Sequence, residues 1–326
     1  MHAPQTFGRG KRFDHPVLDS PGWWRRPPRL YPWSGSCKPL DWGGRKLLVT
    51  GATGTLGQAF ARICEDRALP FCLTDRAELD ICDPASVAKA IDRHQPWAVI
   101  NTAGFVRVAD AELERDSCFA WNSTGAENLA LACERAAIPL VTFSSDLVFD
   151  GRLGRAYVES DRVSPQGAYG ESKAEAERLV ARASQNALII RAAAFFGPWD
   201  RFNFAWAVLS ALQRGEEFRA CSHSFVSPTY VPDLCHAALD LLIDGETGIW
   251  HLANEGQITW HEFARQIARG MGYDEKAIVE ESVPETRVTA LASERGQLLR
   301  PFAAALDEYL EQMRHAEENA SAVAAE

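Results

Sequence analysis

The sequence has 326 residues, 46% of them hydrophobic, so it is long enough to bury a large core. A formal net charge of −10 at pH 7 argues against broad binding to nucleic acids or anionic membranes. No apolar run is long enough to span a membrane, and the first residues lack the order of a signal peptide, so we expect a cytoplasmic protein. The eight cysteines are scattered without zinc-site spacing, and no metal site is predicted.

Residues 1–44 differ in composition from the rest of the chain. They are rich in Pro, Trp, Arg and Gly, are locally basic, and show no sustained hydrophobic period. We predict an irregular N-terminal extension. Its cluster Trp23-Trp24-Arg25-Arg26 suits either contact with a nucleic acid or partner, or packing on the body of the protein, and we favour packing because it covers the tryptophans.

A glycine-rich turn follows the first strand-like run. Leu47 to Val49 are apolar, and the chain then passes Gly51, Gly54 and Gly57 before a helical pattern begins. In such a turn the glycines allow a tight bend, close approach of a pyrophosphate, and close packing of helix on strand. The whole loop, including Thr55 and Leu56, is therefore predicted to bind a dinucleotide.

The next apolar run, Phe71 to Thr74, ends at Asp75, where a carboxylate would meet a ribose hydroxyl. Asp75 suits the free 2′-hydroxyl of NAD, whereas the neighbouring Arg76 suits the 2′-phosphate of NADP. The sequence leaves NADPH and NADH open as the cofactor.

Strand and helix patterns then alternate through residues 45–194, as a doubly wound parallel sheet requires. We therefore predict an α/β fold: a Rossmann-type dinucleotide-binding domain at 45–194 and a smaller C-terminal α/β lobe for the substrate, mainly at 195–313.

Small residues after the third strand, Thr102, Ala103 and Gly104, leave room for the cofactor at the carboxyl edge of the sheet. The predicted strands are 46–50, 71–74, 98–101, 140–144 and 187–191; the predicted helices are 58–68, 84–94, 118–137, 169–183, 204–214, 232–243, 259–270 and 302–313.

Two further stretches carry candidate catalytic residues. The fourth strand ends at Ser145, and a later helix contains Tyr169 and Lys173, which lie on one helix face because they are four residues apart. An ammonium beside a phenol lowers the tyrosine pKa from about 10 towards working pH. We expect Tyr169 to exchange a proton with the substrate and Ser145 to hydrogen-bond the same substrate oxygen.

With these motifs the chain resembles an extended short-chain dehydrogenase/reductase, and more narrowly the dTDP-4-dehydrorhamnose reductase family, which includes regulatory subunits of methionine adenosyltransferase. The resemblance covers about residues 46–312. The resemblance is based on the glycine loop and on the segments 79–84, 99–104, 144–151, 169–173, 227–234 and 248–252.

The resemblance implies Tyr169 as proton donor, Lys173 as pKa tuner and nicotinamide-ribose ligand, and Ser145 as third catalytic residue. It also places Asp80 and Ile81 near the adenine. The implied reaction is reduction of the C4 ketone of a nucleotide-linked 4-keto-6-deoxysugar by NADPH or NADH. A non-catalytic regulatory subunit, and an epimerase or dehydratase with Asp146 beside the serine, remain alternatives. A homodimer is also expected from relatives.

The expected substrate lobe opens with an aromatic run at 195–204. Phe195 offers a stacking surface, Arg201 could bind a diphosphate, and Asn203 lies in the same run; an aromatic core with a solvated arginine is the alternative. Ser145 and Asp146 complete the expected substrate site.

Departures from the family pattern concern the substrate side: the segments 108–112 and 287–291, and Ala194 in place of an aromatic. The N-terminal extension resembles a junction in longer proteins that place a glycosidase-like domain before such a reductase. Residues 314–326 are predicted to form a disordered tail.

Overall fold

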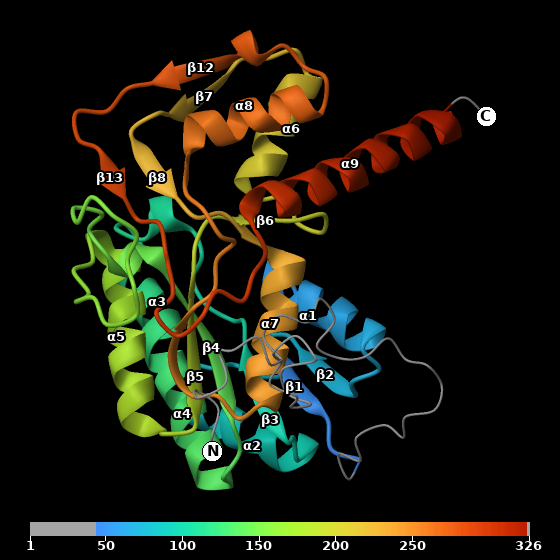
Figure 1. Cartoon of the computed structure of the whole chain (residues 1–326). Helices are drawn as coiled ribbons and strands as arrows, with labels where there is room; N and C mark the ends of the chain where they lie inside the picture. The colour runs from blue at the N-terminus through green and yellow to red at the C-terminus, as the bar shows by residue number, and fades with distance from the viewer. Residues whose placement is uncertain (1–43, 325–326) are drawn as a thin grey trace, which may run out of the picture. The chain divides into compact units, whose positions relative to one another are not determined.

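A computed structural model describes residues 44–324, with side chains as far as Glu318 (Figure 1). The predicted extension lies outside the described residues apart from Gly44, and so does the predicted junction with a glycosidase-like domain. Among the helices of the described part, none combines the length and the apolar character needed to cross a membrane.

A six-stranded parallel sheet forms the centre of the described part, with strand order β10-β5-β4-β3-β1-β2. Its strands are β1 (Leu47–Thr50), β2 (Phe71–Thr74), β3 (Ala98–Asn101), β4 (Leu140–Ser145), β5 (Ala187–Ala192) and β10 (Gly248–His251). The predicted α/β fold is confirmed. The chain order reverses between β1 and β3, which is the switch point where open α/β sheets bind their ligands.

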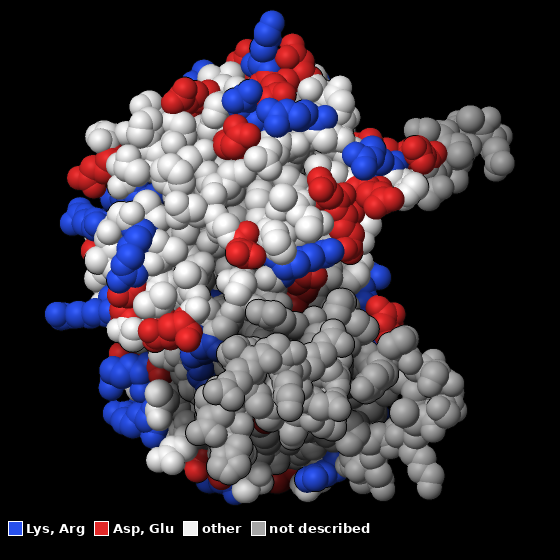
Figure 2. Space-filling model, in the orientation of Figure 1, with Lys and Arg blue, Asp and Glu red and all other residues white. Residues whose placement is uncertain are grey.

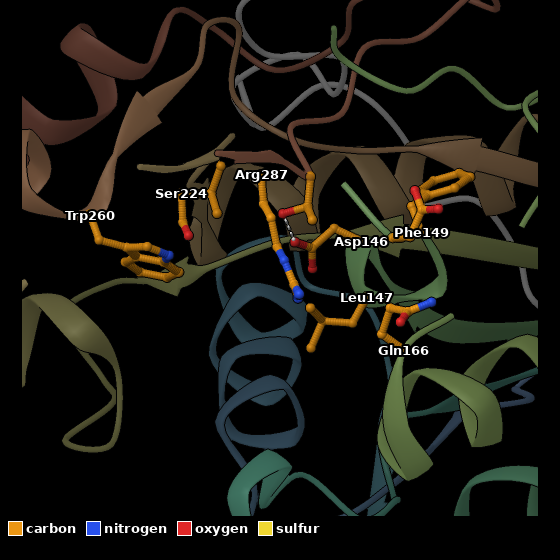
Figure 3. Close-up of a pocket in the computed structure, with 10 residues that line it drawn as sticks. Asp146, Leu147, Phe149, Gln166, Ser224, Trp260 and Arg287 are labelled. Atoms are coloured by element: carbon orange, nitrogen blue, oxygen red, sulfur yellow. Dashed lines mark hydrogen bonds between the residues drawn. The ribbon is translucent and has the colours of Figure 1, made fainter. Parts of the chain in front are cut away.

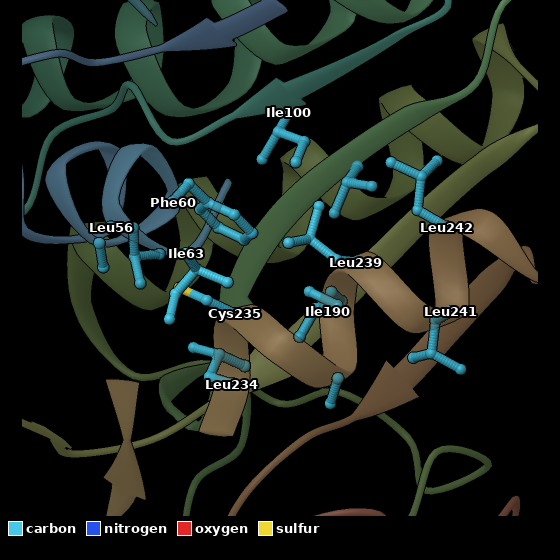
Figure 4. Packing of buried hydrophobic residues seen from close by; sticks show 14 of the residues in the cluster. Leu56, Phe60, Ile63, Ile100, Ile190, Leu234, Cys235, Leu239, Leu241 and Leu242 are labelled. Carbon is cyan, nitrogen blue, oxygen red and sulfur yellow. The ribbon is translucent and has the colours of Figure 1, made fainter. Parts of the chain in front are cut away.

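Helices cover both faces of this sheet because successive strand residues point to opposite sides. Leu47 and Val49 pack against α1 (Thr55–Asp66) and α7 (Val231–Ile243), in the cluster shown in Figure 4. Leu48, between them, packs on the other face against α2 (Pro84–His94), α4 (Gly125–Ala136) and α5 (Gly167–Ala183). The strands β1 and β3 therefore begin with three consecutive buried apolar residues each, and their polar residues, Thr50 and Asn101, stand at their carboxyl ends.

The C-terminal part forms a second core around Phe196. The ring of Phe196 lies 5.3–5.8 Å from the rings of Tyr230, Phe263, Phe302 and Tyr309. Its elements are β6 (Phe195–Phe196), α6 (Phe204–Gln213), β7 (Phe218–Cys221), β8 (Ser224–Val226), β9 (Thr229–Tyr230), β11 (Ile258–Thr259), α8 (Trp260–Gly270), β12 (Ile278–Glu281), β13 (Arg287–Val288) and α9 (Phe302–Ala324). The expected lobe is not continuous in sequence, since α7 and β10 return to the central sheet (Figure 1).

Two helices differ from the prediction. The helix expected at 118–137 consists of α3 (Arg115–Phe119), a π-helical turn at Ala120–Thr124 and α4. Helix α9 continues to Ala324, past the predicted start of a disordered tail at residue 314. That stretch is rich in Ala and Glu and contains neither Gly nor Pro, so its helix propensity is high.

A buried ion pair joins α5 to β5. Arg191 donates to Glu177 through Nε at 2.8 Å and Nη2 at 2.6 Å, and both side chains are almost fully buried. Glu177 also accepts the hydroxyl of Ser144 at 2.5 Å. Glu177 thus ties α5 to β5 through Arg191 and to β4 through Ser144, the residue before Ser145.

We expect Glu177→Gln to destabilise the protein by about 3–5 kcal/mol, because it leaves Arg191 charged and buried without a counter-ion. Urea unfolding at pH 7 measures the loss. Glu175→Gln on the same helix is the matched control: its pair with Arg178 faces solvent, so little stability should be lost. Equal losses in the two variants would contradict the role assigned to the buried pair.

Candidate functional site

The glycine loop closes tightly over the ends of β1 and β3. Gly51 has φ +81°, and a Cβ on it would lie 2.8 Å from Thr102 Oγ1. A Cβ on Gly57 would lie 2.1 Å from the carbonyl oxygen of Gly51, so only glycine lets α1 begin this close to the strand. These two glycines serve the packing that the sequence predicted.

Gly54 differs from both, because the protein around it leaves space. The nearest atom to a Cβ at Gly54 is the Gly51 carbonyl oxygen, at 3.5 Å, and its φ of −89° suits any residue. Gly54 is also the N-cap of α1, and no side chain caps the first N–H groups of that helix. The loop therefore offers uncapped backbone donors beside open space, which fits the pyrophosphate of a dinucleotide.

Thr102, Ala103 and Gly104 connect this loop to α5, which carries the candidate residues Tyr169 and Lys173. Thr102 Oγ1 donates to the Thr50 carbonyl at 2.5 Å, which ties β3 to β1. A Cβ on Gly104 would lie 2.7 Å from Asn122 Oδ1 and 3.7 Å from Lys173 Nζ. The predicted cofactor segment thus runs from the glycine loop to Lys173.

Asp75 and Arg76 lie exposed just after β2, where the sequence placed the ribose end of the cofactor. Asp75 Oδ1 accepts the N–H groups of Ala77 and Glu78 at 2.8 and 3.0 Å. The Arg76 guanidinium lies 4.7 Å from the centre of the Trp121 ring, and its Nε donates to Asp80 at 3.2 Å. Asp75 is thus the candidate ligand for the 2′-hydroxyl of NAD, and Arg76 for the 2′-phosphate of NADP.

Ile81 is buried, whereas the neighbouring Asp80 is partly exposed. The Ile81 side chain is buried against α4, where a Cβ on Gly125 would lie 2.6 Å from Ile81 Cδ1. Asp80 Oδ1 accepts the N–H of Cys82 at 3.0 Å, which holds the turn. Any contact of Ile81 with an adenine would have to come from its backbone.

The candidate catalytic residues stand on two elements that pack together, Ser145 at the end of β4 and Tyr169 and Lys173 on α5. A Cβ on Gly170 would lie 2.2 Å from the Leu147 carbonyl oxygen, so the glycine after Tyr169 lets the helix approach the turn that follows Ser145. Lys173 Nζ donates to the Phe143 carbonyl at 3.1 Å and lies 5.8 Å from the centre of the Tyr169 ring. Lys173 is thus fixed between the strand end and the tyrosine.

Burial shifts the pKa values of this group towards the neutral forms. It raises the pKa of Tyr169, with a smaller contribution from the negative charge of Asp146, and it lowers the pKa of Lys173 to about 8. The sequence predicted a lowered tyrosine pKa, whereas burial raises the pKa of Tyr169 in this structure. The upward direction of the shift favours the neutral phenol, which is the form a proton donor needs.

Asn122 is a site residue that the sequence analysis missed. Its Oδ1 accepts the Phe105 N–H at 2.8 Å and its Nδ2 donates to Ser172 Oγ at 3.0 Å, so it joins the loop after β3 to α5. It lies in the π-helical turn, a feature often found at functional sites. The run Trp-Asn-Ser-Thr at 121–124, composed of weak helix formers, is the sequence signal that could have indicated it.

A cavity of about 240 Å³ opens beside Asp146. Figure 3 shows Trp260 and Ser224 on one side of it and Asp146 and Gln166 on the other, with Arg287 extending from β13 between them. Leu147, Phe149, Asp150, Val226 and Thr289 complete the lining. An aromatic ring, a guanidinium and several hydrogen-bonding groups suit an anionic, partly aromatic ligand.

Of the expected substrate residues, Asp146 lines this cavity and Ser145 directly precedes it, whereas Phe195, Arg201 and Asn203 do not line it. Phe195 packs against the core of the central sheet. Asn203 caps α6, accepting the Trp206 N–H at 2.8 Å and donating to the Asp200 carbonyl at 2.9 Å, so its hydrogen-bonding groups serve the fold. Arg201 is exposed and lies 5.5 Å from the Trp206 ring.

No group of three or more His, Cys, Asp or Glu side chains in the described residues is arranged to hold a metal ion. On the face drawn in Figure 2, acidic and basic side chains of the described residues are interspersed.

The parallel sheet, its glycine loop at the switch point, and the Ser-Tyr-Lys group at the end of β4 define a short-chain dehydrogenase/reductase. A sequence profile described as "RmlD substrate binding domain" matches residues 45–319, and the chain belongs to this family.

Similar proteins include two curated relatives. The dTDP-4-keto-6-deoxy-D-glucose reductase of Streptomyces niveus is 33% identical over 244 residues, covering 74% of this chain and 84% of that protein. The dTDP-4-dehydrorhamnose reductase of Aggregatibacter actinomycetemcomitans is 33% identical over 271 residues, covering 80% and 90%. A crystal structure of dTDP-4-dehydrorhamnose reductase from Bacillus anthracis in complex with NADP matches with a TM-score of 0.77 and 25% identity, over 82% of this chain and 99% of that one.

Substitutions at Gly54 and Gly57 allow the role of the glycine loop in cofactor binding to be tested separately from its role in folding. We expect Gly54→Ala to keep the melting temperature but to weaken NADPH binding at least about tenfold, because the added methyl occupies space that the protein leaves open. Gly57→Ala should lower the melting temperature itself, since its Cβ collides with the backbone. Thermal melts and NADPH fluorescence titrations check both; unchanged binding in Gly54→Ala would exclude this loop as the pyrophosphate site.

Proposed function

We propose that this protein reduces the C4 ketone of a nucleotide-linked 4-keto-6-deoxysugar, with NADPH or NADH as the reductant. The observation that carries the proposal is the set of Ser145, Tyr169 and Lys173 at the end of β4, beside a loop suited to a dinucleotide and a cavity lined by Arg287 and Trp260. The relatives named above are reductases of dTDP-linked sugars, and one solved relative is bound to NADP.

In this reaction the bound nicotinamide supplies the hydride that adds to C4. The ketone oxygen gains negative charge as the hydride arrives, and Tyr169 is placed to protonate it. Lys173, while protonated, stabilises the phenolate that remains, and its bond to the Phe143 carbonyl holds it in position. Ser145 orients the same oxygen by a hydrogen bond.

The cavity beside Asp146 is the proposed site of the nucleotide sugar. Arg287 is exposed at its rim and can pair with a diphosphate, and the Trp260 ring offers a face for stacking. A cytoplasmic location, a homodimer and a link to a glycosidase-like domain stay predictions from the sequence.

We expect Tyr169→Phe to lower kcat for dTDP-4-keto-6-deoxysugar reduction by about 10²–10⁴-fold, because the variant lacks the proton donor. Oxidation of NADPH and NADH, followed by absorbance, measures the rate and also shows which cofactor is preferred. Tyr273→Phe removes a phenol hydroxyl from a residue that follows α8, packs against the C-terminal core and does not line the cavity, so it should leave kcat unchanged.

The same assay separates the alternatives. Cofactor binding without turnover in the unchanged protein would favour a regulatory subunit. Conversion of the sugar without net cofactor oxidation would favour an epimerase or dehydratase, since these enzymes return the hydride to the product.

A further inference from the structure

The hydroxyl of Ser145 is already engaged within the protein. Ser145 Oγ donates to Asp146 Oδ1 at 2.9 Å and accepts the Leu147 N–H at 3.1 Å. A hydroxyl has one hydrogen, and here that hydrogen points at a carboxylate. While Asp146 is ionised, Ser145 can accept a hydrogen bond from a substrate but has none to donate.

Asp146 is itself held firmly in place. Its other oxygen, Oδ2, accepts the Thr289 hydroxyl at 2.7 Å, a bond drawn in Figure 3, and its side chain is buried. A rotation of the serine hydroxyl towards a substrate would leave the buried carboxylate with one donor fewer, which is costly. A proton on Asp146 avoids this cost, because a neutral acid can donate to Ser145 Oγ.

We propose that Asp146 is a positioning residue that sets the direction of the Ser145 hydroxyl. As a carboxylate, Asp146 accepts a hydrogen bond from the Ser145 hydroxyl. As a neutral acid, it donates a hydrogen bond to Ser145 Oγ, and the serine hydroxyl is then free to donate to the ketone oxygen. The inference rests on the proposed reduction, since it concerns how Ser145 acts on that oxygen.

The surroundings of Asp146 allow both states near neutral pH. Burial raises the pKa of Asp146 to about 6, against the lowering effect of the hydrogen bonds from Thr289 and Ser145. The titratable groups around it are Tyr169 and Lys173 on α5, Asp150 in the loop after β4, and Arg287 on β13. An anionic nucleotide sugar in the same cavity adds negative charge and so favours the neutral acid.

The first test is the pH dependence of kcat. In the unchanged enzyme kcat should fall as pH rises through the pKa of Asp146, because the serine hydrogen is then withdrawn from the substrate. Asp146→Asn mimics the neutral acid, and its amide can donate to Ser145 while Thr289 donates to its oxygen, so this fall should disappear. The separate fall expected above about pH 8, where Lys173 loses its proton, should remain.

Thr289 provides a second, milder variant. Thr289→Val removes one hydrogen bond to the carboxylate form and should move the fall in kcat to higher pH by about one unit. Thr289→Ser keeps the hydroxyl and should leave the fall where it is in the unchanged enzyme. A residue that only stabilises the fold would change the melting temperature without moving the pH profile.

A titration of the Asp146 carboxyl by ¹³C NMR, assigned with Asp146→Asn, tests the same point without turnover. The carboxyl should titrate at higher pH in Thr289→Val than in Thr289→Ser. Absence of turnover in the unchanged protein would count against the reductase, whereas this titration still decides whether Asp146 exchanges its proton in this pH range. A fall in kcat that persists in Asp146→Asn, or a carboxyl that titrates below pH 4 in every variant, would overturn the proposal.

Discussion

The site depends on close approach between backbone segments at one edge of the sheet. Gly57 lies against the Gly51 carbonyl, Gly51 against Thr102, and Gly170 against the Leu147 carbonyl, and a Cβ at any of the three would be closer than 3.0 Å to its neighbour. The first two contacts bring the start of α1 to the ends of β1 and β3. The third brings α5 to the turn after β4. The glycine loop and the helix with Tyr169 and Lys173 therefore share one edge of the sheet, because a glycine stands at each of these close contacts.

The parts that could be predicted are those whose signals are local. Five of the six sheet strands were predicted because strands buried on both faces are short apolar runs, and the glycine loop, Asp75 and the Tyr169–Lys173 pair have fixed spacing along the chain. β10 was missed as a strand. Its residues, Gly248–His251, follow a long excursion through the C-terminal part, and nothing local indicates that they rejoin the sheet beside β5.

The substrate side could be predicted far less well, because its wall combines distant segments. Trp260 begins α8, Ser224 begins β8 and Arg287 begins β13, and only the tertiary fold brings them to Asp146. Aromatic and polar residues at 195–204 suggested a binding surface from composition alone. Composition cannot distinguish a residue that faces a ligand from one that fills a core or caps a helix, and Phe195 and Asn203 have these structural roles.

One physical cause acts on all three titratable groups at the catalytic end of the site. Burial favours the uncharged form of Tyr169, of Lys173 and of Asp146 alike. Their protonation states are therefore sensitive to any charge that a ligand brings, since a low-dielectric site screens such charge weakly. The Thr289 hydroxyl connects Asp146 to the segment that contains Arg287, which lies outside the central sheet. An anion bound at Arg287 would thus act on Ser145 through two hydrogen bonds, from Thr289 to Asp146 and from Ser145 to Asp146.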